Sequence, residues 1–177
     1  MDTQDMLTGS PLGSPSLRAD SIRFSVPGQP QGKGRPRVGQ IAGHARMFTP
    51  AKTIAYEGFI ALQAQIAMAG HDLVEGPVLV RMFIALQVPT SWSQKKQRAA
   101  LDGLHFPTTK PDVDNTVKAV FDGLNGVVWR DDVQVVDLQL TKRYSASPRV
   151  EVEVVPIVVT QLVQRETLQA DLLEEAA

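Results

Sequence analysis

The sequence predicts one α+β domain, or mixed α/β domain, in which helices pack on a single mixed sheet. Its 177 residues, 43% of them hydrophobic, can form one core but are too few for two domains of ordinary size. The predicted elements follow the order strand, hairpin, helix, strand, helix, helix, strand, strand. Cysteine is absent, so any metal would have to be held by oxygen atoms or by the three histidines.

We expect the folded domain to span residues 21–159. Residues 1–20 are rich in Ser, Gly, Pro and Asp without periodicity, which predicts a disordered leader. They contain two acidic residues before the first basic one and no apolar run, so they are not typical of a signal peptide. Residues 160–177 predict an acidic tail or a short helix. We therefore expect a soluble cytoplasmic protein.

The first strand is predicted over residues 21–26, where Ile22, Phe24 and Val26 alternate with polar neighbours. A proline and a glycine end this run. The glycine-rich segment 28–48 follows, and it predicts an irregular or hairpin-forming loop that carries basic side chains.

A long helix is predicted over residues 50–69, with Thr49 as its N-cap and Pro50 as its first residue. Its apolar residues recur at roughly helical spacing: Ile54, Phe59, Leu62 and Ile66. The next segment, 77–88, is an almost continuous apolar run. Such a run predicts a central strand that is covered on both faces.

The second half of the chain predicts two helices and two strands. Residues 93–101 form a short polar helix, and residues 114–125 form a helix that Gly126 ends. The buried side of this second helix is predicted to comprise Val117, Val120, Phe121 and Leu124. Segments 133–144 and 149–159 are predicted strands, and the short SASP link between them favours a hairpin.

Charge is distributed unevenly along the chain, although the formal net charge is only −1. Residues 18–52 have a net charge of +6, whereas residues 165–177 have a net charge of −3. The basic residues of the first segment are Arg18, Arg23, Lys33, Arg35, Arg37, Arg46 and Lys52. A near-neutral total therefore conceals a positive region of the kind that attracts a phosphate backbone.

A group of aspartates carries the chemical signal. Asp112 and Asp114 flank the start of a predicted helix, and Lys118 follows Asp114 by one turn on the same face. Asp131 and Asp132 come after that helix, and they approach its start only if the intervening loop folds back. Mg²⁺ prefers oxygen ligands and keeps several waters, so two or three carboxylates beside a phosphate predict a site for phosphodiester hydrolysis.

Each of these residues also has a structural alternative. The aspartates at the helix start are individually typical of an N-cap, and the later pair is typical of a polar loop before a strand. Lys118 alone would be a solvated helix residue. We assign Asp122 and Asn125 to structure, and Trp129 to the core or a wall. The basic loop alone could be a solvated segment.

Several segments, taken in their order, resemble the RusA family of Holliday-junction resolvases. They are PGQPQGKGRPR, FTPAKTIAYE, KPDVDNTVKAVFDGLNG and VVWRDDVQVV, followed by the basic strand end Lys142-Arg143-Tyr144. The resemblance covers roughly residues 22–155. Its most specific part is D-x-D-N-x-x-K followed by W-x-D-D.

The resemblance implies a homodimeric α/β endonuclease that requires Mg²⁺ and resolves four-way junctions by paired symmetric nicks in DNA recombination and repair. It implies that Asp112, Asp114 and Asp132 bind the metal and take part in catalysis. Lys118 corresponds to the catalytic lysine, and Asp131 is a less certain neighbour. We also expect Mn²⁺ to be able to replace Mg²⁺.

DNA contacts are expected from the basic loop and from one residue beside the aspartates. These residues are Lys33, Arg35, Arg37 and Lys110. The family is common on phage and prophage genomes, which makes a phage origin plausible.

Two other functions are compatible with the same residues. One is a branched-DNA-binding accessory protein without catalytic activity, although the complete set of aspartates and Lys118 disfavours it. The other is a metal-dependent hydrolase of a different phosphate ester. The strongly basic segment favours a polyanionic substrate over a small one.

Overall fold

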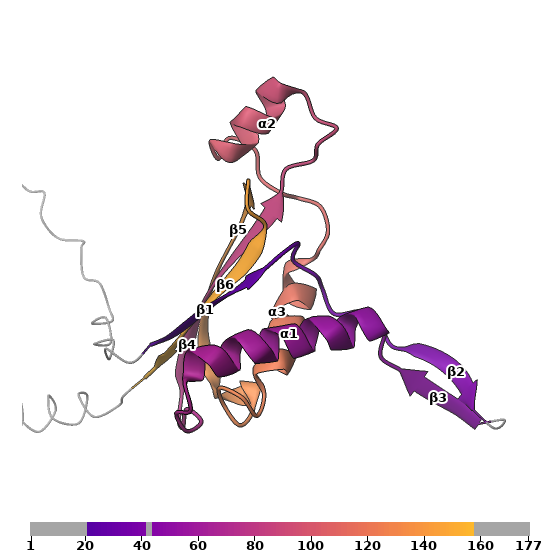
Figure 1. Ribbon diagram of the computed structural model, residues 1–177, viewed down its shortest axis with the longest axis vertical. Helices are drawn as coiled ribbons and strands as arrows, with labels where there is room; N and C mark the ends of the chain where they lie inside the picture. Colours follow the sequence, from indigo (N-terminus) through magenta and orange to yellow (C-terminus); the bar gives the residue numbers. More distant parts are fainter. Residues whose placement is uncertain (1–20, 42–43, 158–177) are drawn as a thin grey trace, which may run out of the picture.

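The computed structural model describes residues 21–41 and 44–157, and the predictions for the leader and the acidic tail lie outside them. Figure 1 shows the described elements in space. They are β1 (Ile22–Pro27), β2 (Arg37–Ile41), β3 (His44–Phe48), α1 (Ala51–Met68), β4 (Val78–Gln87), α2 (Gln94–Leu101), α3 (Val113–Leu124), the 3-10 helix η1 (Asp132–Gln134), β5 (Val135–Ser145) and β6 (Arg149–Pro156). The predicted order of helices and strands is confirmed.

Four strands form one mixed sheet in the order β1-β6-β4-β5, and β2 and β3 form a separate antiparallel hairpin. β4 pairs in parallel with β5 and antiparallel with β6, while β1 pairs antiparallel with β6. The apolar strand β4 is therefore central, as predicted. It is not covered by helices on both faces as expected, because α1 and α3 pack on the same face and Arg81 and Phe83 on the other face are partly exposed.

The predicted hairpin of the last two strands is wrong, because β4 lies between β5 and β6. The link after Ser145 crosses the end of β4, since Ser145 is paired with Gln87 and Arg149 with Ala85. A β5–β6 hairpin would have displaced β4 from between them. The observed order satisfies the backbone of the most apolar strand on both edges.

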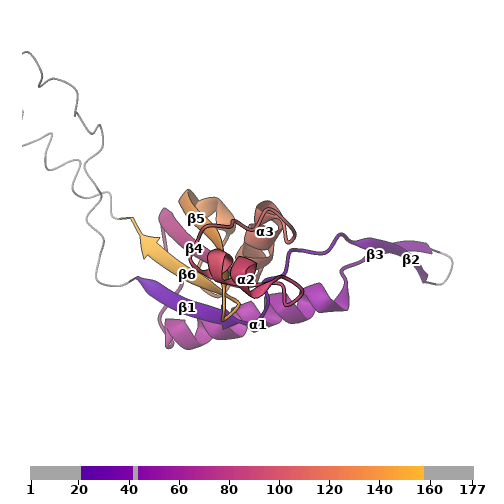
Figure 2. The same ribbon diagram turned by 90° about the horizontal axis from the view of Figure 1, so that it is seen from above.

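α1 and α3 cover the same face of the sheet (Figures 1 and 2). The core between helices and sheet includes Ile60, Val80, Val120, Trp129 and Val152. Burial of this apolar surface is the main stabilising contribution to the fold.

The opposite face of the sheet is polar. There the guanidinium of Arg23 donates to Glu153 at 2.6 Å, Arg81 donates to the other oxygen of Glu153 at 3.2 Å, and Arg81 also donates to Gln139 at 3.1 Å. This row of bonds crosses all four strands. One face of the sheet therefore meets solvent, and the residues of β1 accordingly alternate between the core side and the exposed side.

The start of α1 differs from the prediction, because Pro50 and not Thr49 occupies the N-cap position. The Pro50 carbonyl accepts hydrogen bonds from the backbone of Thr53 at 2.9 Å and of Ile54 at 3.2 Å. A proline has no N–H to leave unpaired at this position. The two bonds to the Pro50 carbonyl are the first hydrogen bonds of the helix itself, and the N-cap residue supplies no side-chain cap.

The buried face of α1 consists mainly of residues that its predicted spacing did not include. Ile54, Leu62 and Ile66 are exposed, whereas Phe59 packs against the core. The fully or nearly buried residues of α1 are Thr53, Tyr56, Ile60, Ala64 and Met68. The helix is therefore apolar on more than its buried side.

α3 crosses α1 closely at Gly123. A Cβ atom on Gly123 would lie 2.9 Å from the Glu57 carbonyl oxygen and from Ile60, so the crossing requires a glycine. The predicted buried side of α3 is confirmed, and Trp129 is a core residue whose indole donates to Asn125 Oδ1 at 2.7 Å. Among the described helices, none is both long and apolar enough to cross a membrane.

Candidate active site

The start of α3 presents two exposed carboxylates. Asp112 occupies the N-cap position, and its backbone carbonyl accepts from the backbone N–H and the hydroxyl of Thr116 at 3.0 and 2.9 Å. All residues of α3 lie in the described part of the chain, and none of them donates a capping hydrogen bond to the Asp112 carboxylate. Asp114 is exposed in the first turn. Asp112 therefore occupies the N-cap position proposed as an alternative, but its carboxylate does not make the capping hydrogen bond and is left for other contacts.

The segment before α3 is fixed by Lys142, a residue near the end of β5. Its ammonium donates to the carbonyl oxygens of Thr109 at 2.6 Å and Pro111 at 2.8 Å. The Lys110–Pro111 peptide bond between them is cis. The two hydrogen bonds from Lys142 set the position of Asp112. The sequence identified Lys142 only as part of a basic strand end, because its partners lie more than 30 residues away.

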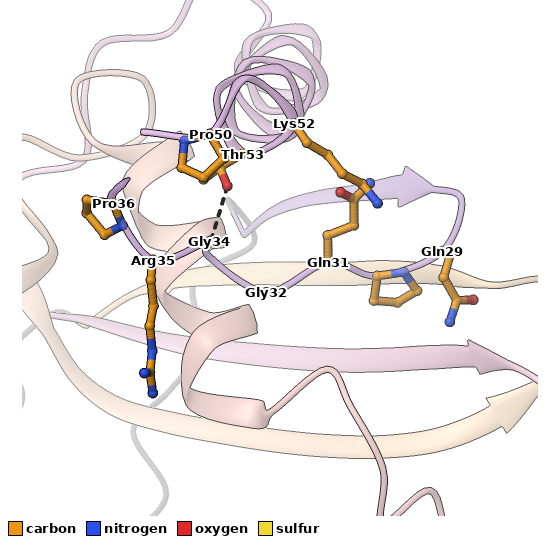
Figure 3. A pocket seen from close by; sticks show the side chains of 10 residues that line it. Gln29, Gln31, Gly32, Gly34, Arg35, Pro36, Pro50, Lys52 and Thr53 are labelled. Atoms are coloured by element: carbon orange, nitrogen blue, oxygen red, sulfur yellow. Dashed lines mark hydrogen bonds between the residues drawn. The ribbon is translucent and has the colours of Figure 1, made fainter. Parts of the chain in front are cut away.

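The basic loop after β1 lies against the same end of α3. The backbone N–H of Lys33 donates to the Asn115 carbonyl at 2.8 Å, and that of Gly34 donates to Thr53 Oγ1 of α1 at 3.1 Å (Figure 3). A Cβ on Gly34 would lie 2.7 Å from that hydroxyl oxygen, so the loop requires a glycine for this approach. In Figure 3 the Arg35 side chain points away from α1.

Loop and helix start together line a cleft of about 720 Å³. Its lining residues are Gln29, Pro30, Gly32, Lys33, Arg35, Lys110, Pro111, Asp112 and Asn115. Three of the four predicted DNA contacts therefore lie beside a predicted metal ligand. The fourth, Arg37, is the first residue of β2.

Lys33 differs from the other cations of the cleft because its ammonium is already paired. It forms an ion pair with Asp122 of α3 and lies 3.7 Å from Glu57 Oε1 of α1. The hydrogen bond that the Lys33 ammonium donates to Asp122 is the main cause that raises the pKa of Lys33, and burial raises the pKa of Glu57. Lys33 therefore connects the loop to both helices, and this role was not predicted.

Lys118 lies one turn after Asp114 and is exposed, as is Asp114. Asp114, Lys118 and Asp122 are spaced by four residues and so follow one face of α3. The predicted catalytic lysine is thus placed between the two ends of the helix.

Asp132 lies at the opposite end of α3 from Asp112. It begins η1, and burial is the main cause that raises its pKa, followed by the carboxylates of Asp131 and then Asp122. η1 leads into the beginning of β5, whereas Lys142, near the other end of β5, contacts the segment before α3. The loop before β5 therefore does not fold back to the start of α3.

Asp131, the residue before Asp132, has a structural role at the start of η1. Its carboxylate accepts from the backbone of Val133 at 3.1 Å, and the Gln134 side chain accepts from the Asp131 backbone at 3.3 Å, which together form a capping box. Gln134 also donates to the carbonyls of Val74 and Gly76, both at 2.9 Å. These bonds hold the turn in place.

The predicted three-aspartate cluster is not assembled within one chain. Across residues 21–41 and 44–157, no three Asp, Glu or His side chains lie close enough to hold one metal ion. Asp112 and Asp114 remain together at the start of α3, and Asp132 remains a predicted ligand that lies apart from them.

Comparison with known proteins gives two matches. The family of the endodeoxyribonuclease RusA matches residues 27–155. A protein of Bacillus subtilis (strain 168) described as "Uncharacterized protein YqaN" is 44% identical over 135 residues, which cover 75% of this chain and 94% of that protein. The family match includes every residue of the cleft and every predicted metal ligand.

Proposed function

Because the chain belongs to the RusA family of endodeoxyribonucleases, we propose that it is a Mg²⁺-dependent endonuclease that resolves four-way DNA junctions by paired symmetric nicks. The observation that supports this most directly is the cleft at the start of α3, which Asp112 lines together with Arg35 and Lys110. Its proposed role in the cell is in DNA recombination and repair.

The residues at the start of α3 suit a hydrated divalent cation. Two carboxylates together with waters and a substrate phosphate are an ordinary ligand set for Mg²⁺. Asp112 and Asp114 would hold the ion, and neither depends on its side chain for capping the helix. Activation of water and neutralisation of phosphate charge are what a bound metal supplies at such sites.

The positive groups of the cleft would bind the phosphate backbone. Arg35 and Lys110 are exposed, and the N-terminal end of α3 adds the partial positive charge of its unpaired backbone N–H groups. Lys118, one turn further on, would stabilise the negative charge that develops as the phosphodiester bond is cut. The substrate is therefore expected to be a polyanion that extends beyond the cleft.

We propose that the homodimer brings Asp132 into the site. Among the described residues of one chain, Asp132 does not form a metal-binding group with the two aspartates at the start of α3. A second copy of the chain could supply it. Two equivalent sites related by a two-fold axis would also match the near-symmetry of a four-way junction.

Mixing two inactive variants tests this arrangement. If Asp132 acts across the dimer, a heterodimer of Asp114→Asn and Asp132→Asn contains one site in which both aspartates are intact. Nicking activity should then return on subunit exchange, whereas each variant alone is inactive. Failure of the mixture to nick, with exchange verified by differently tagged subunits, would exclude an Asp132 supplied by the partner.

Junction selectivity is tested by cleavage of a synthetic mobile four-way junction beside a linear duplex of the same sequence, with Mg²⁺, Mn²⁺ or EDTA. Paired nicks on the junction alone, and only with metal, are expected. The alternative, a branched-DNA-binding accessory protein, predicts tight junction binding without cleavage under any divalent metal. Cleavage of linear duplex at an equal rate would remove structure selectivity from the proposal.

A further inference from the structure

α2 and the segment after it carry exposed cations and aromatic rings that the proposed cutting site does not use. Of the eight residues of α2, only Ala100 is buried, and α2 contributes none of the residues of the main core cluster. Figure 1 shows α2 standing apart from α1 and α3, beyond one end of the sheet. Packing of the main core therefore does not account for this helix.

We propose that this region is a second DNA-contact surface, which holds unstacked bases and their phosphates at the branch point of the substrate. We call it the α2 surface and define it by Lys95, Lys96, Arg98, Phe106 and Arg143. The proposal rests on the proposed function, because it assumes that branched DNA is bound at the nearby cleft.

The charge of the region favours a polyanion. Residues 92–111 contain four basic residues and one acidic residue, Asp102. Lys95, Lys96 and Arg98 are all exposed. Arg98 Nε lies 3.9 Å from Asp102 Oδ2, which is a weak surface ion pair. Three exposed cations within four residues are suited to neutralising the phosphates of a nucleic acid.

The aromatic residues form an ordered group next to these cations. Trp92 makes edge contacts with His105 at 6.2 Å and with Tyr144 at 5.4 Å between ring centroids, and the Lys96 ammonium lies 3.8 Å from the Trp92 ring. Trp92 thus joins α2 to the end of β5. The contact between Trp92 and Tyr144 therefore holds α2 in a fixed position beside β5.

Phe106 is the ring best placed to stack on a base. It is 58% exposed, and the Arg143 guanidinium lies 4.7 Å from its centroid. An exposed aromatic ring beside a cation is the arrangement by which proteins bind single-stranded nucleic acid, where rings stack on bases and cations follow the backbone.

The α2 surface is joined to the cleft by a short segment that is held in place. Phe106 precedes Asp112 by six residues, and the intervening carbonyls of Thr109 and Pro111 are bonded to Lys142, the neighbour of Arg143. In Figure 1 α3 lies in the angle between α2 and the β2–β3 hairpin. DNA bound at the start of α3 would therefore meet the basic loop on one side and the α2 surface on the other.

The two kinds of side chain would make different contributions. The cations bind any phosphate backbone, so they should increase affinity for linear duplex and junction alike. Phe106 can stack only on a base that is not already stacked in a duplex. It should therefore contribute to affinity for branched DNA alone, and so to the preference for the junction.

The test is equilibrium binding of the full chain, in EDTA to prevent cutting, to a labelled four-way junction and to a linear duplex of the same sequence. Phe106→Ala should weaken junction binding roughly fivefold or more, the loss of one base stack, and leave duplex binding within about twofold. The double variant Lys95→Gln/Lys96→Gln should weaken both and reduce the slope of log K against log salt by about 2.

A matched control is taken from another exposed position. Leu62→Ala removes an exposed apolar side chain from α1. It should bind like wild type. Equal binding by wild type, Phe106→Ala and the double lysine variant would overturn the α2 surface while leaving the proposed function intact, provided that wild type cuts junctions. A wild type that neither binds nor cuts junction DNA would overturn both.

Fluorescence gives an independent measurement of the same contact. The chain has two tryptophans, and Trp129 is fully buried, so a change on junction binding should come from Trp92. The change should disappear in Trp92→Phe. An unchanged spectrum at saturating junction DNA would contradict a contact at the α2 surface.

Discussion

The two ends of α3 both carry aspartates, but the carboxylates have different surroundings. At the N-terminal end, Asp112 and Asp114 are exposed, and Asp112 lies in a cleft with Arg35 and Lys110. At the C-terminal end, Asp122 is paired with Lys33. The difference shows that the partners of a carboxylate, more than its place in a motif, determine whether it is free for chemistry.

Asp131 and Asp132 extend this contrast within a single dipeptide. The Asp131 carboxylate caps η1, whereas burial and the neighbouring Asp131 and Asp122 raise the pKa of Asp132. A carboxylate held in such surroundings is destabilised when it is ionised without a cation. Asp131 thus contributes to the fold, and Asp132 is the member of the pair with a reason to bind a cation.

Lys118 gives the largest effect that would sharpen the comparison. Lys118→Ala should lower the single-turnover rate of junction cleavage by about 100-fold or more, the scale of losing one electrostatic contact to a transition state. Junction affinity should stay within about twofold, and Lys118→Arg should keep part of the rate. An Ala variant that cuts at the wild-type rate would remove Lys118 from the site.

Lys142 tests whether the N-terminal end of α3 depends on being held from β5. Lys142→Met leaves the carbonyls of Thr109 and Pro111 without their donor and should lower the cleavage rate about tenfold through misplacement of Asp112. Junction affinity should change little, so kcat falls more than KM rises. A loss confined to KM would indicate that Lys142 contacts DNA instead.

Lys33 tests the structural character of the other end. Because its ammonium is paired with Asp122 and both side chains are about one third exposed, Lys33→Met should lower the free energy of unfolding by about 1 kcal/mol. The loss should be smaller when Asp122→Asn is already present, as measured by urea unfolding of both single variants and the double variant.

The same substitution separates Lys33 from Arg35 as DNA contacts. Arg35→Gln should reduce the salt slope of junction binding by about 1, whereas Lys33→Met should reduce it by less because the ammonium is already neutralised. Equal reductions would show that Lys33 leaves Asp122 for a phosphate when DNA binds.

Asp132 should give the smallest effect on stability, and one with an unusual sign. The pKa of Asp132 is raised in the folded state. As pH rises above the ordinary pKa of an aspartate, the carboxyl therefore ionises more readily in the unfolded chain than in the folded one. The free energy of unfolding falls until the pH has passed the folded-state pKa. Asp132→Asn should therefore stabilise the metal-free protein at pH 7 by less than about 1 kcal/mol, while junction cleavage is lost. Its urea midpoint should match wild type near pH 3; a destabilised variant at pH 7 would contradict the account.

The sequence predicted the parts of this contrast that depend on neighbouring residues. The helix over Asp114 and Lys118, its end at Gly126 and the burial of Trp129 follow from local spacing and are confirmed. The aspartate motif likewise identified the family.

The parts that depend on strand order could not be predicted. The SASP link suggested a hairpin, yet β4 separates β5 from β6, and only this arrangement tells which end of β5 approaches Asp112. Lys142 arrives there and Asp132 does not. The bond from Lys33 to Asp122 spans 89 residues, and no local pattern announces it.

The central claim is that the N-terminal end of α3 is where DNA is cut. Its most direct test is the single-turnover rate of paired nicking of a four-way junction by wild type, Asp114→Asn and Asp122→Asn, with junction binding measured in parallel. Asp114→Asn should lose at least about 100-fold in rate and still bind, whereas Asp122→Asn should keep most of its activity. Full activity in Asp114→Asn, or loss confined to Asp122→Asn, would place the chemistry elsewhere.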